Sequence, residues 1–360
     1  MILIYFVFVI SYAYGLRNYK VSRELNMIDH NWYVIGETNS YCSTNPKKII
    51  INDTPITVWK DNHDRYSGIY DVCPHRGASL SNGRIDKENN CVVCPYHTFK
   101  YNSHGRLVQT PGQKQLRGND FYNYRTDVPY FKIVNLNNWL YLNKRPIFDV
   151  KTDLPDQNTI WLEPEAGNES FRSISISKDF KMDARTVTEN SLDILHISEV
   201  HTFGNKKRPL PISRKLEKIA EGHHKYTYEY EAGEDSMASK LFGKKQLTVE
   251  NEYILPHYTV ARVIFGDYVN TVITSALPIN ENETRLFVKT YRNNWVFNIP
   301  FVDDLFDEVT KRMMDKTLRE DKAVIEQIYF KYRDGNYITK YDDLTKLYRE
   351  DYHNLVNRST

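Results

Sequence analysis

The chain has 360 residues, of which 41% are apolar and 26% charged, a globular composition long enough for two domains. Its formal net charge is only +2, so the overall charge gives no indication of nucleic-acid binding. Four cysteines are too few for a disulfide framework in a chain of this length, and this favours a reducing compartment, cytoplasmic or organellar.

The first sixteen residues, MILIYFVFVISYAYGL, are almost wholly apolar and lead into Arg17 and Lys20. As a helix they would reach only about 24 Å, short of the roughly 30 Å hydrocarbon core of a bilayer. They also lack the basic start of a secretory signal. We expect residues 1–26 to be a hydrophobic anchor or targeting segment, able to associate with a membrane through residues 1–16. An extension upstream of a fold that begins near Met27 is the alternative.

Short strand-like runs separated by turn residues follow from residue 32 to about residue 146. Asn82-Gly83 and His104-Gly105 are turn signals among them. This spacing predicts a small antiparallel β domain, assigned to residues 27–150, with functional loops at one tip.

Two half-sites in this region each contain one cysteine and one histidine: Cys73-Pro-His75 and Cys94-Pro-Tyr-His97. They supply the ligand set of a Rieske [2Fe–2S] cluster, in which one iron is bound by two cysteines and the other by two histidines. A single zinc ion is the alternative. Zinc sites, however, usually pair two cysteines in one half-site and two histidines in the other.

A second group of metal-binding residue types reads Glu189-Asn190-Ser-Leu-Asp193-Ile-Leu-His196-Ile-Ser-Glu-Val-His201. If this stretch forms one helix, at 100° per residue, Asp193 projects between His196 and His201, and Asn190 falls within about 20° of His201. Two histidines beside an aspartate on one helical face predict a metal site.

The expected site is the 2-His-1-carboxylate arrangement of non-haem Fe(II), which leaves positions open for O2. Its third ligand must come from elsewhere in the chain. Asp193 could bind the metal itself, but a better use is to accept the N–H of His196 and fix its tautomer. Glu199 is a local alternative ligand.

A polar connector at residues 151–167 precedes this group, and residues 225–296 alternate as long half-buried strands. A helix is predicted from about residue 302 to residue 332, with a mostly apolar stripe at Leu305, Val309, Met313, Ile325 and Ile328. The charged stretch Arg319-Glu320-Asp321-Lys322 interrupts the stripe. A carboxylate there can face inward to the metal, or the stretch can be solvated helix surface.

Together these motifs closely resemble the Rieske-type non-haem iron oxygenases, specifically the large terminal-oxygenase α subunits of the aromatic-ring-hydroxylating family in its monooxygenase and O-demethylase branch. The resemblance covers nearly everything after Asn31. It implies an α+β fold, with an N-terminal antiparallel β Rieske domain. A helix-grip (START-like) catalytic domain follows at residues 151–360, with an antiparallel sheet and a long C-terminal helix. In the family, Gly-Trp follows the last cluster histidine, whereas this chain has Thr98 and Phe99.

The resemblance also implies roles for the matching residues. The [2Fe–2S] cluster would be bound by Cys73, His75, Cys94 and His97, and mononuclear Fe(II) by His196, His201 and Asp321, with Glu320 as the alternative to Asp321. Asp193 and Asn190 would be the catalytic residues. Asp193 would bridge His196 to His97 of a neighbouring subunit, as expected in a head-to-tail homotrimer.

The implied activity is oxygenation of a small hydrophobic organic substrate by O2, as hydroxylation or oxidative demethylation, with monooxygenation favoured over dioxygenation. No Gly-rich nucleotide fingerprint follows a strand, so electrons must come from an external ferredoxin or flavin reductase. The basic loops Lys206-Lys207-Arg208 and Lys244-Lys245 could dock an acidic donor or simply be solvated. The alternative function is a non-catalytic Rieske electron carrier or redox-sensing lipid-binding protein, which would have no reason to keep the second group of ligands.

Overall fold

The computed structural model describes residues 31–357 except 43, 62, 113–125, 149–153, 235, 237–238, 241–242, 244–245 and 294–295. Three predictions therefore lie outside the described residues: the N-terminal segment 1–26, the basic loop Lys244-Lys245 and the domain boundary at residue 150. In the part of the chain that is described, no helix is both long and apolar enough to cross a membrane.

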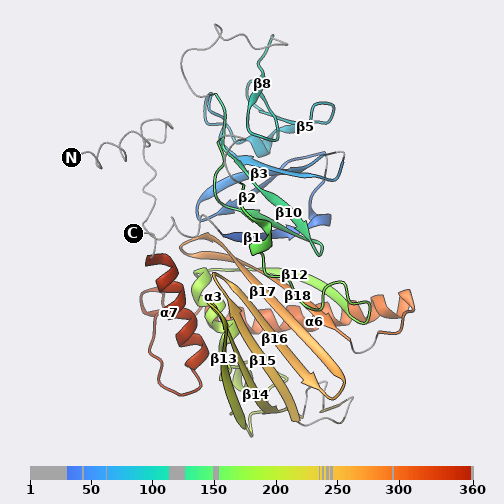
Figure 1. The fold of residues 1–360 in the computed structure, drawn as a ribbon, viewed down its shortest axis with the longest axis vertical. Coiled ribbons are helices and arrows are strands. Elements are labelled where there is room, and N and C mark those ends of the chain that lie inside the picture. The colour runs from blue at the N-terminus through green and yellow to red at the C-terminus, as the bar shows by residue number, and fades with distance from the viewer. Residues whose placement is uncertain are drawn as a thin grey trace, which may run out of the picture.

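Small antiparallel sheets make up the N-terminal part, in the upper half of Figure 1. Their strand orders are β1-β11-β10, β2-β3-β4-β9 and β5-β6-β7-β8. The strands are β1 (Trp32–Glu37), β2 (Lys47–Ile51), β3 (Thr54–Lys60), β4 (Tyr66–Tyr70), β5 (Arg84–Asp86), β6 (Cys91–Val93), β7 (Lys100–Tyr101), β8 (Leu107–Gln109), β9 (Tyr130–Phe131), β10 (Ile133–Leu136) and β11 (Trp139–Asn143). Short 3₁₀ helices are η1 (Thr38–Ser40) and η2 (Leu80–Asn82). The predicted antiparallel β architecture of this part is confirmed.

The hairpin between β2 and β3 shows how local sequence sets this architecture. Its two connecting residues, Asn52 and Asp53, both have positive φ (45° and 59°). Type I′ two-residue hairpin turns require positive φ at both positions, and asparagine and aspartate tolerate it better than most residues.

A single seven-stranded antiparallel sheet forms the C-terminal part, in the order β12-β18-β17-β16-β15-β14-β13. The strands are β12 (Arg172–Phe180), β13 (Ser213–Ala220), β14 (His223–Glu231), β15 (Gln246–Ile254), β16 (Tyr258–Phe265), β17 (Tyr268–Asn280) and β18 (Glu283–Arg292). The helices are α3 (Ala184–Leu192), α4 (Ile197–Val200), α6 (Pro300–Ile325) and α7 (Asp343–Asn357), with 3₁₀ helices η4 (Gln157–Thr159) and η5 (Phe330–Tyr332). The predicted α+β class is confirmed.

The seven-stranded sheet has two differently covered faces, because side chains alternate along each strand. Phe287 and Tyr291 of β18 belong to a core shared with Trp139 and other residues of the N-terminal part. Val288 points the other way, into a core with residues of α3 and α6. On the first face the buried Lys289 ammonium donates to Glu163 (2.9 Å) and to the Asn137 carbonyl (2.8 Å), so an ion pair lies where the two parts of the chain meet.

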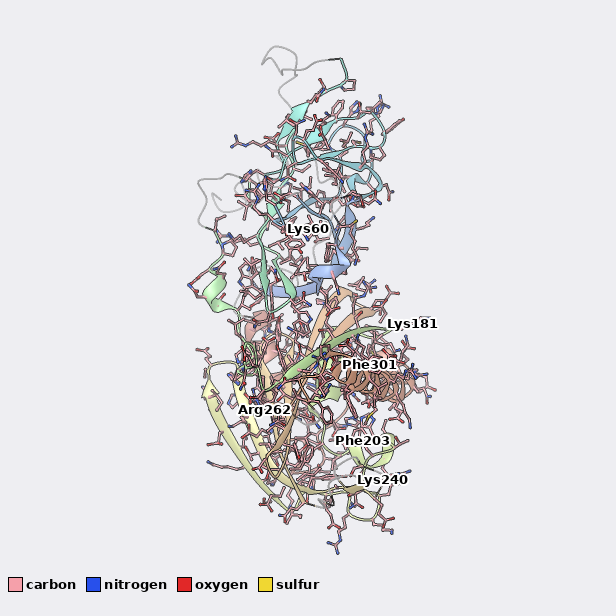
Figure 2. The ribbon with its side chains drawn as sticks, turned by 90° about the vertical axis from the view of Figure 1, so that its right-hand side faces the viewer. Lys60, Lys181, Phe203, Lys240, Arg262 and Phe301 are labelled. Atoms are coloured by element: carbon pink, nitrogen blue, oxygen red, sulfur yellow. The ribbon has the colours of Figure 1, made fainter. Side chains whose placement is uncertain are left out.

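The predicted apolar stripe of the long helix is mostly not part of the core. Leu305 is 56% exposed and Met313 45%, whereas Ile325 is buried. The N-terminal half of α6 turns its charged face to β12, where Arg172 pairs with Asp307 (2.6 Å), so its apolar residues face outward. The view of Figure 2 looks nearly along α6 beside the sheet, with Phe301 at the start of the helix. The helix also ends at Ile325, earlier than predicted.

Candidate metal centres

The two cluster half-sites lie in loops with the same backbone pattern. The N–H of the fourth residue after each cysteine donates to that cysteine's carbonyl, from Gly77 to Cys73 (2.8 Å) and from Thr98 to Cys94 (3.1 Å). Each cysteine N–H in turn donates to the carbonyl five residues on, at 2.9 and 2.8 Å. Gly77 and Thr98 both have positive φ, 71° and 59°. Thr98 therefore occupies a left-handed position that suits glycine, the residue expected there from the family pattern.

These loops bring all four predicted cluster ligands to one place. The Cys73 and Cys94 side chains are buried, and the His75 and His97 rings lie 4.5 Å apart, His75 exposed and His97 half-buried. Phe99, which replaces the expected tryptophan, stacks on His75 at 4.8 Å and 5°. The thiols thus point inward and the imidazoles outward.

The spacing of the four groups suits a two-iron cluster better than one ion. Among the described residues, one set of three or more histidine, cysteine or acidic ligand atoms lies within 4.8 Å of one another, and it does not include these four residues. Two cysteines and two histidines that do not converge on a single point fit separate irons. Burial raises the pKa of the Cys73 thiol, and the neighbouring Cys94 thiol adds to this. A bound metal would stabilise the thiolate instead.

Sequence reasoning did not single out Tyr101 at this centre. Its hydroxyl lies 3.4 Å from the Cys73 sulfur, and the side chain is buried. Once the sulfur is a metal-bound thiolate it can only accept, so the tyrosine O–H donates. The position of Tyr101, four residues after His97, is the only sequence signal that could have indicated it.

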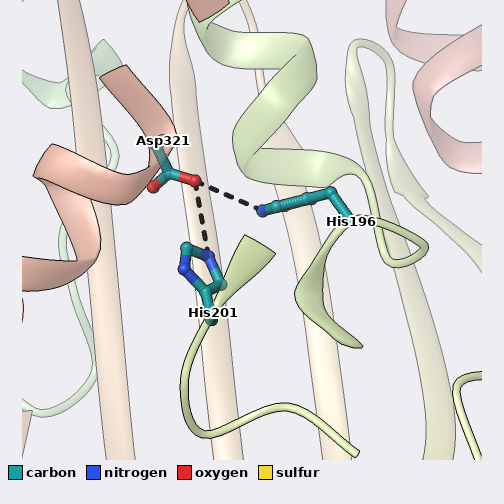
Figure 3. Close-up of side chains that lie close together, drawn as sticks. All are labelled: His196, His201 and Asp321. Carbon is teal, nitrogen blue, oxygen red and sulfur yellow. Dashed lines mark ion pairs between the residues drawn. The ribbon is translucent and has the colours of Figure 1, made fainter. Parts of the chain in front are cut away.

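The ligand set that does converge is His196, His201 and Asp321, drawn in Figure 3. One Asp321 oxygen, Oδ1, lies 3.4 Å from Nε2 of His196 and 3.4 Å from Nε2 of His201. Ligand atoms about 2.1 Å from one metal ion, at 90–110° to one another, are roughly 3.0–3.4 Å apart. Buried Asp321 Oδ1, the atom that faces both histidines, has no hydrogen-bond partner. The donor set and this orphaned oxygen fit a bound cation.

The prediction that residues 189–201 form one helix is wrong. Helix α3 ends at Leu192, and Asp193 is extended (φ −72°, ψ 124°) before the short helix α4. The Asp193 side chain accepts from the Leu195 N–H (2.8 Å), a local bond that competes with helix continuation. Although residues 189–201 are not one helix, the turn after α3 still places His196 and His201 close to Asp321 of α6.

The other predicted residues lie around this set in different ways. Asp193 Oδ2 is 3.5 Å from Nδ1 of His196, near enough for an ion pair. Asn190 lies in the last turn of α3, where its carbonyl accepts from the Asp193 N–H (3.2 Å). Glu199 is exposed on α4 and outside the converging set, while Glu320 lies behind His201.

Electrostatics distinguish the two histidines. Burial disfavours the charged form of His196, but the carboxylates of Asp193 and Asp321 outweigh it and raise its pKa to about 9. Burial dominates at His201 and lowers its pKa, although Asp321 opposes the change. The Phe203 ring stacks on His201 at 4.9 Å and 16°, a contact that sequence reasoning missed.

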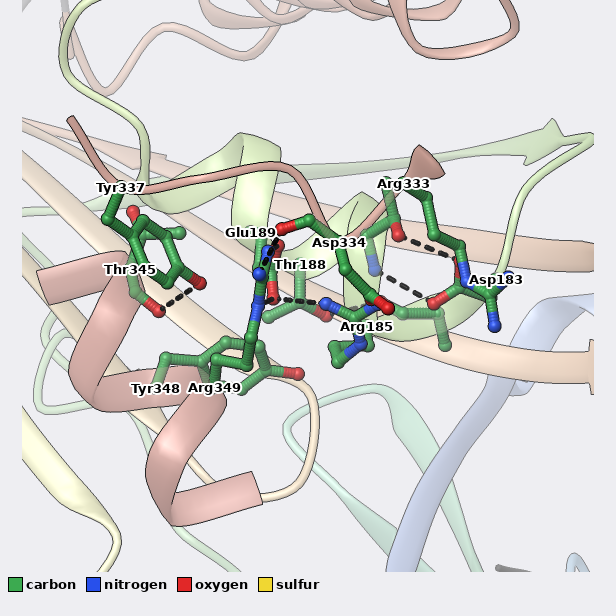
Figure 4. A network of polar contacts seen from close by, with 12 residues as sticks. Asp183, Arg185, Thr188, Glu189, Arg333, Asp334, Tyr337, Thr345, Tyr348 and Arg349 are labelled. Carbon is green, nitrogen blue, oxygen red and sulfur yellow. Dashed lines mark hydrogen bonds and ion pairs between the residues drawn. The ribbon is translucent and has the colours of Figure 1, made fainter. Parts of the chain in front are cut away.

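Helix α3, which leads into the histidine-bearing turn, is fixed by the polar network of Figure 4. The Glu189 carboxylate accepts from Arg185 one turn earlier (2.6 Å) and from Arg349 of α7 (2.7 Å). Its side chain and that of Arg185 are both buried. The buried Glu189 carboxylate thus links α3 to α7 through a charge-assisted hydrogen bond from Arg349.

Two family descriptions match the chain in succession. The Rieske [2Fe-2S] domain matches residues 31–129, and the vanillate O-demethylase oxygenase C-terminal domain matches residues 180–347. The converging ligand set lies within the second match.

Similar proteins include pheophorbide a oxygenase, chloroplastic, of Oryza sativa, 25% identical over 76% of this chain and 50% of that protein. Another is the toluene-4-sulfonate monooxygenase iron-sulfur subunit TsaM1 of Comamonas testosteroni, 26% identical over 47% of this chain and 45% of that protein. The chain thus spans about half the length of these relatives.

The fold is also that of solved structures at low sequence identity. Dicamba monooxygenase bound to dicamba has a TM-score of 0.75 at 17% identity, over 92% of this chain and 98% of that one. NdmA of Pseudomonas putida has a TM-score of 0.74 at 18% identity, over 93% of each chain. The chain thus carries a Rieske [2Fe-2S] domain followed by a vanillate O-demethylase oxygenase C-terminal domain, each holding its expected ligand types, which is the domain order expected from its resemblance to the Rieske-type non-haem iron oxygenases.

Proposed function

We propose that the chain is a Rieske-type oxygenase that takes electrons from an external ferredoxin or flavin reductase and uses O2 to hydroxylate or oxidatively demethylate a hydrophobic organic substrate. When bound, the [2Fe–2S] cluster would supply electron transfer, and mononuclear Fe(II) would supply O2 activation. Cys73, His75, Cys94 and His97 would hold the cluster, and His196, His201 and Asp321 the iron. Monooxygenation is favoured over dioxygenation, in line with the relatives' names.

The convergence of His196, His201 and Asp321 carries this proposal. A Rieske electron carrier or a redox-sensing lipid-binding protein needs only the cluster. Such a protein would have no use for two imidazoles and a carboxylate gathered around one point beneath the sheet. The oxygenase is therefore preferred to the non-catalytic alternative.

The face of the seven-stranded sheet that packs against α3 and α6 favours an apolar substrate. Ala261, Val263 and Val272 lie on the face that packs against α3 and α6, and each is only partly covered. Among the similar solved structures, dicamba monooxygenase is bound to dicamba, and an NdmA mutant is bound to theobromine or to caffeine, all of them ring compounds. A compact ring compound is the substrate class we propose here.

Electrons would enter at the exposed edge of His75, whose ring lies 4.5 Å from that of His97. The Tyr96 ring, 60% exposed, lies against His97 at 3.8 Å. The basic loop at residues 206–208 is a weaker candidate for docking a donor. Lys207 is paired with Glu234 (2.9 Å) and Arg208 with Glu231, so these two charges are already partly neutralised.

A head-to-tail homotrimer remains part of the proposal. The cluster loops lie with the β5–β8 sheet in the upper half of Figure 1, while α3 and α6 lie in the lower half, beyond the other small sheets. Electron transfer between subunits, with Asp193 joining His196 to His97 of a neighbour, would shorten this path. The outward apolar residues of α6 offer surface for such an assembly. A reducing compartment suits this chemistry, and three relatives, among them pheophorbide a oxygenase, are chloroplastic.

Metal and sulfide analysis tests the proposal. Anaerobically purified protein should contain about three irons and two acid-labile sulfides per chain, a Rieske EPR signal and a ferrous site that binds nitric oxide. About two irons without a nitric-oxide signal would indicate the carrier, and zinc would refute both functions.

An Asp193→Ala variant tests the bridge separately. It should keep both metal centres and lose turnover, because Asp193 is outside the converging ligand set, His196 keeps its contact with Asp321, and only the proposed electron path through Asp193 is removed. Retained substrate-coupled oxygenation in this variant would contradict the bridge.

A further inference from the structure

The structure assigns a positioning role to Glu320, the residue before Asp321. We propose that its carboxylate accepts the Nδ1–H of His201 and so keeps the Nε2 lone pair of that histidine facing the metal position. The inference rests on the proposed function, since it concerns how the candidate iron site is held. Of the two adjacent acidic residues of α6, Glu320 would orient His201 and Asp321 would bind the metal.

The contact between Glu320 and His201 is well formed. Glu320 Oε2 lies 3.1 Å from His201 Nδ1, and both side chains are largely covered, at 18% and 5% exposed. The other Glu320 oxygen, Oε1, lies 3.9 Å from the Lys316 ammonium one turn earlier. Each oxygen of the carboxylate thus has its own partner, and Oε2 is directed to the histidine.

The acceptor chemistry of Glu320 selects one tautomer of His201. An ionised carboxylate can only accept hydrogen bonds, so the proton of a neutral imidazole must sit on Nδ1. Nε2, 3.4 Å from Asp321 Oδ1, then carries the lone pair that a metal requires. The Phe203 ring, stacked on His201, limits rotation of the imidazole out of this plane.

The same geometry argues against Glu320 as an alternative iron ligand. It contacts Nδ1, whereas Asp321 lies at Nε2, on the opposite side of the ring. The converging set contains His196, His201 and Asp321 but not Glu320. The corresponding contact at His196, from Asp193, is longer at 3.5 Å, and His196 Nδ1 has no hydrogen bond. Glu320 is therefore the better placed of the two supporting carboxylates.

Two substitutions separate positioning from ligation. In Glu320→Gln the amide oxygen can still accept the Nδ1–H, whereas Glu320→Leu removes the acceptor and keeps similar bulk. Glu308 on the same helix, paired with Arg312 at the surface, provides the matched control variants Glu308→Gln and Glu308→Leu. An unchanged Rieske EPR signal and thermal midpoint establish that each variant is folded.

The readout is Fe(II) affinity of the mononuclear site in protein that keeps its cluster, together with the EPR spectrum of the nitric oxide adduct. Loss of a group that orients a metal-bound histidine costs roughly 10–100-fold in metal affinity. We expect Glu320→Leu to lose affinity in this range and to broaden the adduct spectrum. Glu320→Gln and both control variants should stay within about threefold of the parent protein.

Each other result has a definite meaning. Parent-like affinity in Glu320→Leu overturns the positioning role while leaving the proposed function intact. Equal loss in Glu320→Gln and Glu320→Leu shows that the charge or a direct iron bond matters, and this also overturns it. If the parent protein itself takes up no mononuclear Fe(II), the proposed function fails and this inference fails with it.

Discussion

The cluster loops take all four ligands from 25 residues of sequence (73 to 97), whereas Asp321 of the iron set follows His201 by 120 residues. The cluster histidines lie at the surface, where an electron donor can reach them, while His201 and Asp321 are buried between the sheet and α6. Local loop geometry thus forms one centre and tertiary packing the other. The first should depend on turn residues and the second on how the elements are held together.

Among the tests of this difference between the two centres, removing Asp321 should have the largest effect, on the mononuclear iron site alone. Asp321→Ala deletes the oxygen shared by both histidines, so we expect mononuclear iron affinity to fall by roughly a hundredfold or more and turnover to be lost. The Rieske EPR signal should remain. Iron analysis with EPR measures both, and Asp304→Ala, at an exposed position on the same helix, is the control. Joint loss of both centres would show that they are not independent.

Breaking the buried ion pair at the junction should come next. Lys289→Met leaves the Glu163 carboxylate buried without its cation, which destabilises the fold by about 3–5 kcal/mol. Denaturant unfolding followed by circular dichroism measures the loss. Lys207→Met, which removes one side of an exposed pair, should leave unfolding unchanged. Equal midpoints for the two variants would mean that the buried pair does not hold the parts together.

The cluster centre should respond to its tyrosine without losing metal. Tyr101→Phe removes a hydrogen-bond donor to the Cys73 sulfur, and such donors raise the reduction potential by stabilising the more negative reduced cluster. A hydrogen bond to a charged group is worth about 1.5–3 kcal/mol, so the potential should fall by several tens of mV, and by no more than ~130 mV. Protein-film voltammetry measures the shift. Tyr66→Phe, whose hydroxyl contacts the Thr38 carbonyl, should leave the potential in place.

The smallest expected effect tests the turn residue itself. Thr98→Gly relieves a β-branched side chain at positive φ, at some cost in chain entropy, for a net stabilisation of about 0.5–1 kcal/mol. Thermal unfolding should show a rise of a few degrees at most. Gly77→Thr in the other loop should have the opposite sign. A lower midpoint for Thr98→Gly would mean that contacts of the threonine side chain outweigh its backbone strain.

The sequence predicted the cluster centre more completely than the iron centre, because the first depends on local spacing and the second on tertiary packing. Half-site spacing is local, so it indicated the cluster loops and the β scaffold around them. The break at Asp193 was missed because helical periodicity does not show that its side chain can accept the N–H of Leu195, two residues later. The pairing of Asp321 with the histidines needs the sheet that brings α6 beneath α3, and only resemblance indicated it. The outward face of α6 was missed because its charged residues pair with β12.

The matching backbone pattern of the two cluster loops has a mechanical consequence. Each loop supplies one cysteine and one histidine, and each iron takes two ligands of one kind, so every iron would join one loop to the other. A bound cluster would then act as a doubled cross-link closing a segment of about 21 residues between Cys73 and Cys94. A single covalent link across such a segment restricts the unfolded chain by about 3 kcal/mol. Cluster loss would therefore release the two loops from each other and deprive the tip of its main cross-link.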